Sequence, residues 1–140
     1  TKEKEGAMRL FERRRDRTEI PIDAVKKQLE KIAREGGFKA ALLATREGFD
    51  VVETESGIDS SILAALAGLL FEMSTEIRDF SGARHLDHLT MSGPRGDAVI
   101  CRFFDLMDQP VALIIITEMQ SRYRELTDRA VDGIKRILEK

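Results

Sequence analysis

Few residues in this 140-residue chain have the types and spacing that chemistry requires. His85 and His88 have the H-x-x-H spacing of some metal sites. On a strand, however, an odd separation turns two side chains to opposite faces, and no third ligand is fixed nearby. The sequence also lacks the G-x-x-x-x-G-K-[ST] and G-x-G-x-x-G phosphate loops and the G-x-S-x-G nucleophile elbow. We therefore expect no catalytic residue, no metal site and no cofactor.

Three further features have simple structural interpretations. Cys101 lies in an apolar run, where a thiol is a small core residue rather than a nucleophile. The Arg-Gly-Asp triplet at 95–97 is explained by a tight turn that begins at Gly93. With one tyrosine and no tryptophan, the chain lacks the aromatic platform of a single-stranded nucleic-acid binder.

The composition is that of a globular domain rather than a nucleic-acid binder or a disordered chain. It is 42% hydrophobic and 34% charged, and 23 Lys and Arg nearly balance 25 Asp and Glu. A single cysteine cannot form an internal disulfide, so a reducing cytoplasm is the expected compartment. The longest apolar runs, 62–71 and 110–116, are shorter than the ~20 residues that span a bilayer, so stable membrane insertion is not expected.

Charge is distributed unevenly along the chain. Residues 1–19 contain seven bases, five acids and only three large apolar residues, too few to fold alone. We interpret them as a charged, flexible N-terminal arm, separate from a domain over 20–140. Docking of this arm on an anionic surface is the alternative, but its interleaved acids favour a solvated tail.

The rest of the chain predicts the element order α-β-β-α-β-β-β-α. Apolar residues at three- and four-residue steps indicate helices that begin near Ile22, Ser61 and Ser121. Strands are predicted at 38–44, 49–54, 86–91, 97–104 and 111–117, with turns at 46–48, 93–96 and 108–110. Short connections make the sheet antiparallel and put helices on both faces, which is an α/β/α sandwich of the α+β class.

The stretch 62–71 is the most informative part of the sequence. It is apolar all round, whereas a helix lying on one sheet needs only one apolar stripe. A fully buried central helix is one explanation, but a domain of this size has little room for one. A subunit interface is therefore the favoured interpretation.

The order and spacing of these motifs resemble the Roadblock/dynein light chain family from about Ala24 to Leu138. The motifs are Leu29-Glu30-Lys31-Ile32 before Gly36-Gly37, Ala40-Ala41-Leu42-Leu43-Ala44 before Arg46-Glu47-Gly48-Phe49, the helix start Ser61-Ile62-Leu63-Ala64-Ala65-Leu66-Ala67, and the strand Val111–Ile116. Such domains are similar to profilin and longin domains. The resemblance implies a five-stranded antiparallel sheet in the order 2-1-5-4-3.

The resemblance, in particular to bacterial or archaeal regulators of GTPases, also implies a function. Dimers of that family form through the third strand, at the sheet edge, and the second helix. We accordingly predict a homodimer interface made of Leu63, Leu66, Ala67, Leu70, Met73, His88 and Leu89. The implied partner is a small Ras-like GTPase, and the candidate contacts for it are Glu72, Glu76 and Asp79. The chain would then be a non-enzymatic scaffold or a GTPase-activating partner.

Other functions stay open at this point. A small-ligand sensor of profilin-like architecture would require a pocket with convergent polar groups between sheet and helix. An interaction scaffold without any GTPase is a third possibility. Arg84 or Arg95 would serve as an arginine finger in an activating partner, but solvated loop arginines are far commoner than catalytic ones.

Overall fold

The computed structural model describes residues 19–82, 86–118 and 123–139, and its elements follow the predicted order. They are α2 (Glu19–Gly36), β1 (Ala40–Thr45), β2 (Asp50–Glu53), α3 (Ser60–Ser81), β3 (His88–Ser92), β4 (Asp97–Leu106), β5 (Gln109–Glu118) and α4 (Tyr123–Leu138). The predicted N-terminal arm, residues 1–19, lies outside the described residues except for its last position.

The five strands form one antiparallel sheet in the order β2-β1-β5-β4-β3, as predicted. β1 and β5 lie inside the sheet, and this explains why both are buried along nearly their whole length. The turn between β1 and β2 places Gly48 at a φ of 94°, a conformation that favours glycine. β2 and β3 are the two edge strands.

Several element boundaries differ from the predictions by one to three residues, and two of these differences have a clear physical cause. α2 begins at Glu19 rather than Ile22, because Pro21 lies in the first turn, where a proline costs no helical hydrogen bond. The last hairpin turn is formed by Met107 and Asp108, both left-handed with φ of 53° and 60°. Two such residues match the twist of a tight hairpin, so β5 begins at Gln109, before Pro110.

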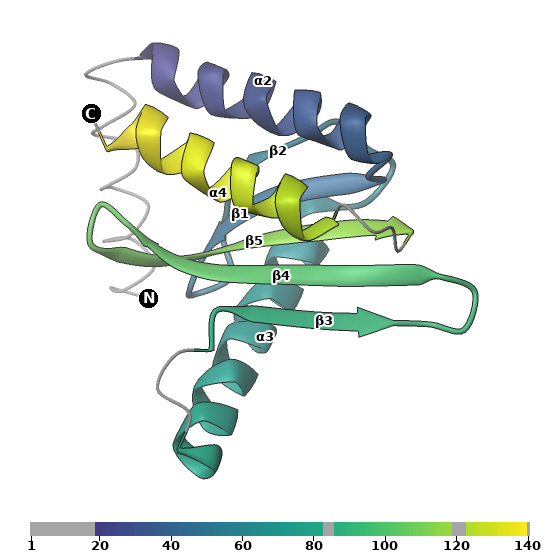
Figure 1. The fold of residues 1–140 in the computed structure, drawn as a ribbon. Helices are drawn as coiled ribbons and strands as arrows, with labels where there is room; N and C mark the ends of the chain where they lie inside the picture. The colour runs from purple at the N-terminus through teal and green to yellow at the C-terminus, as the bar shows by residue number, and fades with distance from the viewer. Residues whose placement is uncertain (1–18, 83–85, 119–122, 140) are drawn as a thin grey trace.

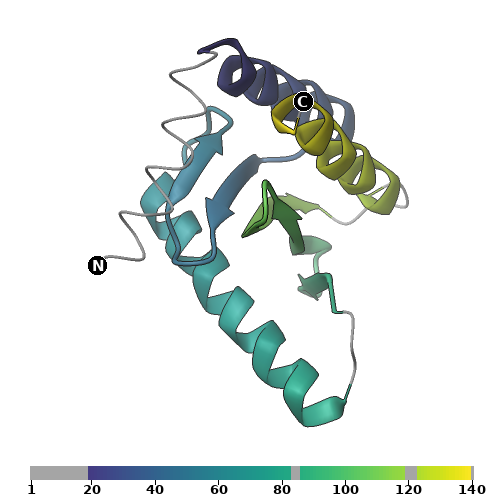
Figure 2. The same cartoon turned by 90° about the vertical axis from the view of Figure 1, so that its left-hand side faces the viewer.

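The helices cover the two faces of the sheet unequally. α2 and α4 lie side by side over one face, and α3 alone crosses the other (Figures 1 and 2). We call α2, α4 and the face they cover the closed layer, whose core includes Leu29, Leu43, Leu113, Leu126 and Ile134. An ion pair of 2.8 Å between Arg129 of α4 and Glu35 of α2 joins its two helices at the surface.

We call α3 and the face it crosses the open layer. α3 begins at the cap residue Asp59, whose Oδ1 accepts a hydrogen bond from the Ser61 N–H at 2.9 Å. Its inner side fits tightly on the β1–β2 turn, since a Cβ added to Gly68 would lie 3.1 Å from the Gly48 Cα. The small residues of α3 thus let it approach the protein's own backbone.

Candidate interaction surface

The outer face of α3 carries an apolar stripe that no described residue covers completely. Leu69 is 55% exposed and Phe80 is 96% exposed. The stripe recurs at three- and four-residue steps along the whole helix and consists of Ile62, Leu66, Leu69, Met73, Ile77 and Phe80. Apolar side chains gathered on an outer helix face are typical of a protein–protein contact.

α3 is also longer than the sheet is wide. Its 22 residues span about 33 Å, whereas five strands span about 19 Å from edge to edge. The helix crosses the strands steeply, and its C-terminal end extends past β3 (Figure 1). Its last aromatic contact with the sheet joins the rings of Phe71 and Phe103, whose centroids are 5.2 Å apart. Ser74 is its last buried residue. We call residues 75–81 the α3 overhang.

No helix of residues 19–82, 86–118 or 123–139 lies above one corner of the open layer. Met91, Val99 and Ile116 are paired in register across β3, β4 and β5 and face the α3 side. They line a mainly apolar hollow of about 350 Å³, and Lys39 and Asp97 form an ion pair of 3.6 Å at its rim. We call this site the corner hollow.

β3 presents a free edge next to this hollow. It pairs with β4 on one side, and no strand in the described ranges pairs with its other side. The unpaired N–H and C=O groups of such an edge can bind a further strand. A free edge, an apolar helix face and an apolar hollow therefore lie together on one side of the molecule.

The structure divides the predicted interface residues between the two sides of α3. Leu63, Ala67 and Leu70 face the sheet and are buried in the protein's own core. Leu66 and Met73 belong to the outer stripe, and His88 and Leu89 are half-buried on β3.

Sequence reasoning missed the most exposed members of the open surface, which are Ile62, Leu69, Ile77, Phe80 and Met91. A signal for the four helix residues was present. The three- and four-residue steps of the stripe to which they belong continue beyond Phe71, where the uninterrupted apolar run ends.

His88 lies where the β3 edge meets the closed layer. Its Nε2 is 2.7 Å from the Thr90 Oγ1, and its ring packs edge-on to Tyr123 of α4 at a centroid distance of 5.9 Å. Burial, and then the charge of Arg102 opposite it on β4, lowers the pKa of His88 below its ordinary value of 6.5. Among the described residues, no three His, Cys, Asp or Glu side chains gather as metal ligands. His85 lies outside those residues.

The predicted partner contacts Glu72, Glu76 and Asp79 are all exposed, at helical steps that place them on one ridge beside the apolar stripe. From Glu47 to Ile77 the chain contains seven acidic residues and no Lys or Arg. The outer side of α3 is therefore both apolar and negatively charged. Of the two candidate arginine fingers, Arg95 is exposed in the β3–β4 turn, and Arg84 lies outside the described residues.

By length and composition alone, α3 is a candidate membrane span, with a mean hydropathy of 1.3 in its most apolar window. The sequence did not predict this, because the uninterrupted run 62–71 is only half the helix. The core helix of a globular domain passes the same test, and α3 packs its inner side against the sheet. Its last ten residues also include Glu72, Glu76, Arg78 and Asp79, which are costly in a bilayer. We interpret α3 as a layer of the fold.

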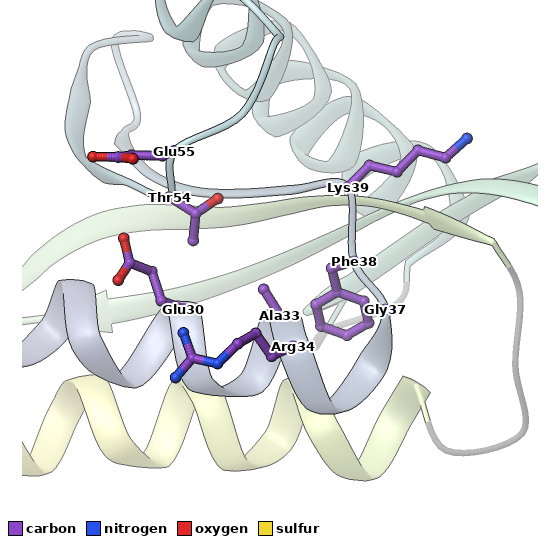
Figure 3. Close-up of a pocket in the computed structure, with 8 residues that line it drawn as sticks. All are labelled: Glu30, Ala33, Arg34, Gly37, Phe38, Lys39, Thr54 and Glu55. Atoms are coloured by element: carbon purple, nitrogen blue, oxygen red, sulfur yellow. The ribbon is translucent and has the colours of Figure 1, made fainter.

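A second hollow, of about 520 Å³, lies between the end of α2, the start of β1 and the segment after β2 (Figure 3). It is lined by charged groups of both signs, including Glu30, Arg34, Lys39 and Glu55. These groups do not converge on one point, since Lys39 points away from Glu30 and Glu55 in Figure 3. The arrangement does not favour the small-ligand sensor that the sequence left open.

Cys101 is buried in the core of the open layer, as predicted. Burial raises the pKa of its thiol to about 12. The thiolate that a nucleophile requires is therefore scarce at neutral pH.

The element order, the sheet order and the placement of the helices together define an α+β fold of the kind seen in a solved Roadblock/LC7 domain. No protein-family model matches the sequence, and no curated protein does. Solved structures, by contrast, match the fold over most of the chain.

The chain is similar to an MglB solved in a tetrameric arrangement, with a TM-score of 0.74 and 20% identity, over 85% of this chain and 90% of that one. It is similar to the gliding protein mglB of Thermus thermophilus, with a TM-score of 0.70 and 19% identity, over 85% and 91%. A Roadblock/LC7 domain from Streptomyces avermitilis gives a TM-score of 0.64 and 12% identity, over 80% and 92%. At these identities the likeness establishes the fold.

Proposed function

We propose that this protein is a non-enzymatic Roadblock-type homodimer that binds and regulates a small Ras-like GTPase. The observation that carries the proposal is the exposed apolar stripe of α3 beside the free edge of β3. One of the similar structures is an MglB in a tetrameric arrangement, so at least one protein with this fold self-associates. The GTPase follows from the family resemblance of the sequence.

The dimer is formed by antiparallel pairing of two β3 edges about a two-fold axis. This pairing satisfies the open backbone groups of both edges and joins the two sheets into one. It also brings the two α3 helices to the same side of the joined sheet, where their outer stripes are removed from water together. Half-buried Leu89 of β3 lies on that side, and His88 lies on the other.

The ridge of Glu72, Glu76 and Asp79 indicates the chemistry of the GTPase surface. A partner that docks beside the α3 stripe meets carboxylates, so its contact surface carries Lys or Arg side chains. Exposed charges of this kind raise the association rate and set specificity, and salt screens them. Binding is therefore faster at low ionic strength.

Self-association is tested with Leu69→Asp, which puts a charge in the centre of the outer stripe. We expect the wild type to sediment as a dimer and the variant as a monomer with an unchanged circular dichroism spectrum. Ile58→Asp places the same charge on an exposed apolar residue outside the stripe and leaves the dimer intact. A monomeric wild type would refute the dimer. Leu70→Asp is unsuitable, since Leu70 belongs to the core.

GTPase regulation is tested by isolating the protein with its partners from its native host. GTP hydrolysis and nucleotide exchange by the recovered GTPase are then measured with and without the protein, and we expect a change of about tenfold or more in one of them. Reversal of the ridge (Glu72→Lys, Glu76→Lys, Asp79→Lys) slows association most at low salt. Its matched control reverses three exposed acids of other elements (Asp23→Lys, Asp105→Lys, Asp132→Lys). Equal rates for both triple variants would contradict the ridge assignment.

A further inference from the structure

We infer that residues 1–18 of the N-terminal arm dock on the β2 edge of their own domain, with the bases of residues 13–17 against the acids of residues 50–55. This contact does not require the proposed dimer, which pairs the opposite edge of the sheet, β3. The sequence alone favours a solvated tail for the arm. The structure adds a free strand edge, an acidic surface beside that edge and a short path to it from the start of α2.

β2 is the second free edge of the sheet. It pairs with β1 on one side, and no strand within 19–82, 86–118 or 123–139 pairs with its other side. The surface is hollowed next to the chain that leaves β2, since Thr54 and Glu55 line two hollows of about 520 and 390 Å³. A free edge can bind a further segment of chain, and hollows of this size can accept long side chains.

The surface beside the β2 edge is strongly acidic. From Glu47 to Asp59 the chain contains five acids and no Lys or Arg. Lys26 of α2 lies 3.9 Å from the Glu55 carboxylate and lines the smaller hollow together with Glu53 and Glu55. Burial, and then the charge of Asp50, raises the pKa of Glu53. A further positive charge is therefore favourable at this surface.

The arm carries the complementary charge. Residues 1–18 contain seven bases and four acids, a net charge of +3. The whole excess lies in residues 13–17, which hold four arginines and one acid, whereas residues 1–12 hold three bases and three acids. Arginine suits a carboxylate surface, because its planar fork can donate two parallel hydrogen bonds to one carboxylate.

The path of the chain places these charges within reach of each other. α2 contacts β1 and β2, whereas α4 contacts β4, so the chain enters α2 on the β2 side of the sheet (Figure 2). Seven helical residues, about 10 Å, separate Lys26 from the start of α2. Residues 13–17 precede that start by at most six residues, about 20 Å of extended chain. A segment tethered so closely has an effective concentration on the order of millimolar, so contacts too weak to hold a free peptide can hold it.

The first test locates the arm in the full chain by paramagnetic relaxation enhancement. A nitroxide is attached at Phe11→Cys, which leaves every charge of the arm in place, and a diamagnetic label is the reference. Burial raises the pKa of the Cys101 thiol to about 12, so this thiol stays unlabelled. We expect signal loss at the amides of Val51 and Glu53 on β2 and none at Met91 on β3. Signal loss confined to the first turn of α2, or equal at both edges, would overturn the inference.

Mixed samples distinguish a protomer's own arm from the arm of a second copy. Nitroxide-labelled chains without isotope are mixed with isotope-labelled chains without nitroxide. We expect no signal loss on β2 in this mixture, because each arm docks on its own domain. Signal loss on β2 that appears only in the mixture would assign the edge to a second copy's arm and overturn the inference.

The second test exchanges the charges of the two partners. Reversal of either partner alone should abolish the signal loss on β2, and reversal of both together should restore it. The surface variant is Asp50→Lys, Glu53→Lys, Glu55→Lys, and the arm variant is Arg13→Glu, Arg14→Glu, Arg15→Glu. A folded double variant that does not regain the signal loss would refute the pairing. If the surface variant does not fold, its neutral form (Asp50→Asn, Glu53→Gln, Glu55→Gln) should weaken the signal loss, and an unchanged loss would refute the pairing.

The matched control reverses the other acidic surface of the domain, the α3 ridge. It consists of Glu72→Lys, Glu76→Lys and Asp79→Lys, which make the same change in net charge. We expect this control to leave the signal loss on β2 unchanged. A control that abolishes the loss would place the arm on α3 and overturn the inference.

Salt distinguishes ion pairing from apolar docking. The Debye length falls from about 10 Å at 0.1 M salt to about 3 Å at 1 M. We therefore expect the signal loss at Val51 and Glu53 to disappear at high salt. Docking through the large apolar residues of the arm, Met8, Leu10 and Phe11, would persist there, and that result would overturn the pairing of charges.

Discussion

Helices cover the two faces of this sheet to different extents. On the closed layer, α2 and α4 together cover the sheet, and the core runs from Val25 to Leu138. On the open layer, α3 is the one described helix over an apolar face, and Met91 and the outer stripe of α3 are exposed. Two helices cover the closed face of the sheet, whereas α3 leaves part of the open face exposed.

The proposed association surface lies on the less completely covered of the two layers. The central strand β5 is buried on both faces, with Leu113 facing the closed layer and Ile114 facing the open one. Such a strand requires cover on each side. Among the described residues, two helices cover the closed layer and one crosses the open layer, so the open layer is the side to which we assign the proposed contact with a second copy.

The largest expected effect is the difference in unfolding free energy between truncating a leucine of the closed layer and truncating a leucine of the outer stripe. Leu126→Ala removes a fully buried side chain of α4 and lowers the free energy of unfolding by about 2–5 kcal/mol. Leu69→Ala removes a side chain that is 55% exposed, and its effect on the protomer is within about 0.5 kcal/mol. Urea unfolding monitored by circular dichroism measures both.

Unfolding measurements at several protein concentrations sharpen this comparison. Dimerisation stabilises the folded state by mass action, so a loss at the interface grows as concentration rises above the dimer Kd. The cost of Leu69→Ala should therefore increase with protein concentration, and the cost of Leu126→Ala should not. The same concentration dependence for both variants would place Leu69 outside the interface.

The order of helices and strands could be predicted from the sequence because local patterns determine it, whereas the order of strands in the sheet was predicted from the family resemblance. The alternation of apolar runs with Gly48, Gly82 and Gly96 marks the turns and helix ends, and each of these glycines has a positive φ. The buried run at 111–116 identifies the interior strand β5. The exact ends of the elements could not be predicted from local patterns. The start of β5, which follows the positive-φ pair Met107 and Asp108, is an example.

The orientation of α3 could not be predicted from the sequence. A helix with apolar residues all round has no polar face to indicate its outer side, so Leu70 and Leu69 are equivalent until the sheet is in place. The structure assigns Leu70 to the core and Leu69 to the surface. The overhang and the corner hollow depend on the angle at which α3 crosses the strands, and no local pattern records that angle.

The second prediction compares two helical glycines, Gly133 in α4 of the closed layer and Gly68 in α3 of the open layer. Gly133→Ala and Gly68→Ala share the same intrinsic gain of about 1 kcal/mol in helix propensity. The new Cβ at Gly133 meets the end of the flexible Gln28 side chain, 2.6 Å from its Nε2, which can move aside. At Gly68 it meets the Gly48 backbone at 3.1 Å, and a shift of backbone costs about 1–3 kcal/mol.

We therefore expect Gly133→Ala to raise the midpoint of thermal unfolding and Gly68→Ala to lower it. If Gly68→Ala were also stabilising, the contact between α3 and the β1–β2 turn would be looser than the structure shows. Such a result would mean that the open layer is also loosely packed on the side of α3 that faces the β1–β2 turn.

The smallest expected effect concerns His88, at the edge where the closed layer ends. Arg102, Arg124, Asp87 and Asp128 are the charged groups around it, and burial with the two arginines outweighs the acids, so its pKa is lowered in the folded state. The unfolded chain consequently binds a proton more readily. The stability that this difference contributes is complete above pH ~6.5 and is lost as pH falls through the folded pKa.

The variant His88→Gln removes this proton-linked term and keeps a polar side chain beside Thr90. Between about pH 7.5 and pH 5.5, the wild type should lose more unfolding free energy than His88→Gln does. Urea titrations at several pH values measure the difference, and parallel pH profiles would contradict the assignment. Pairing of two β3 edges buries His88 further, so the loss on acidification should be larger above the dimer Kd than below it.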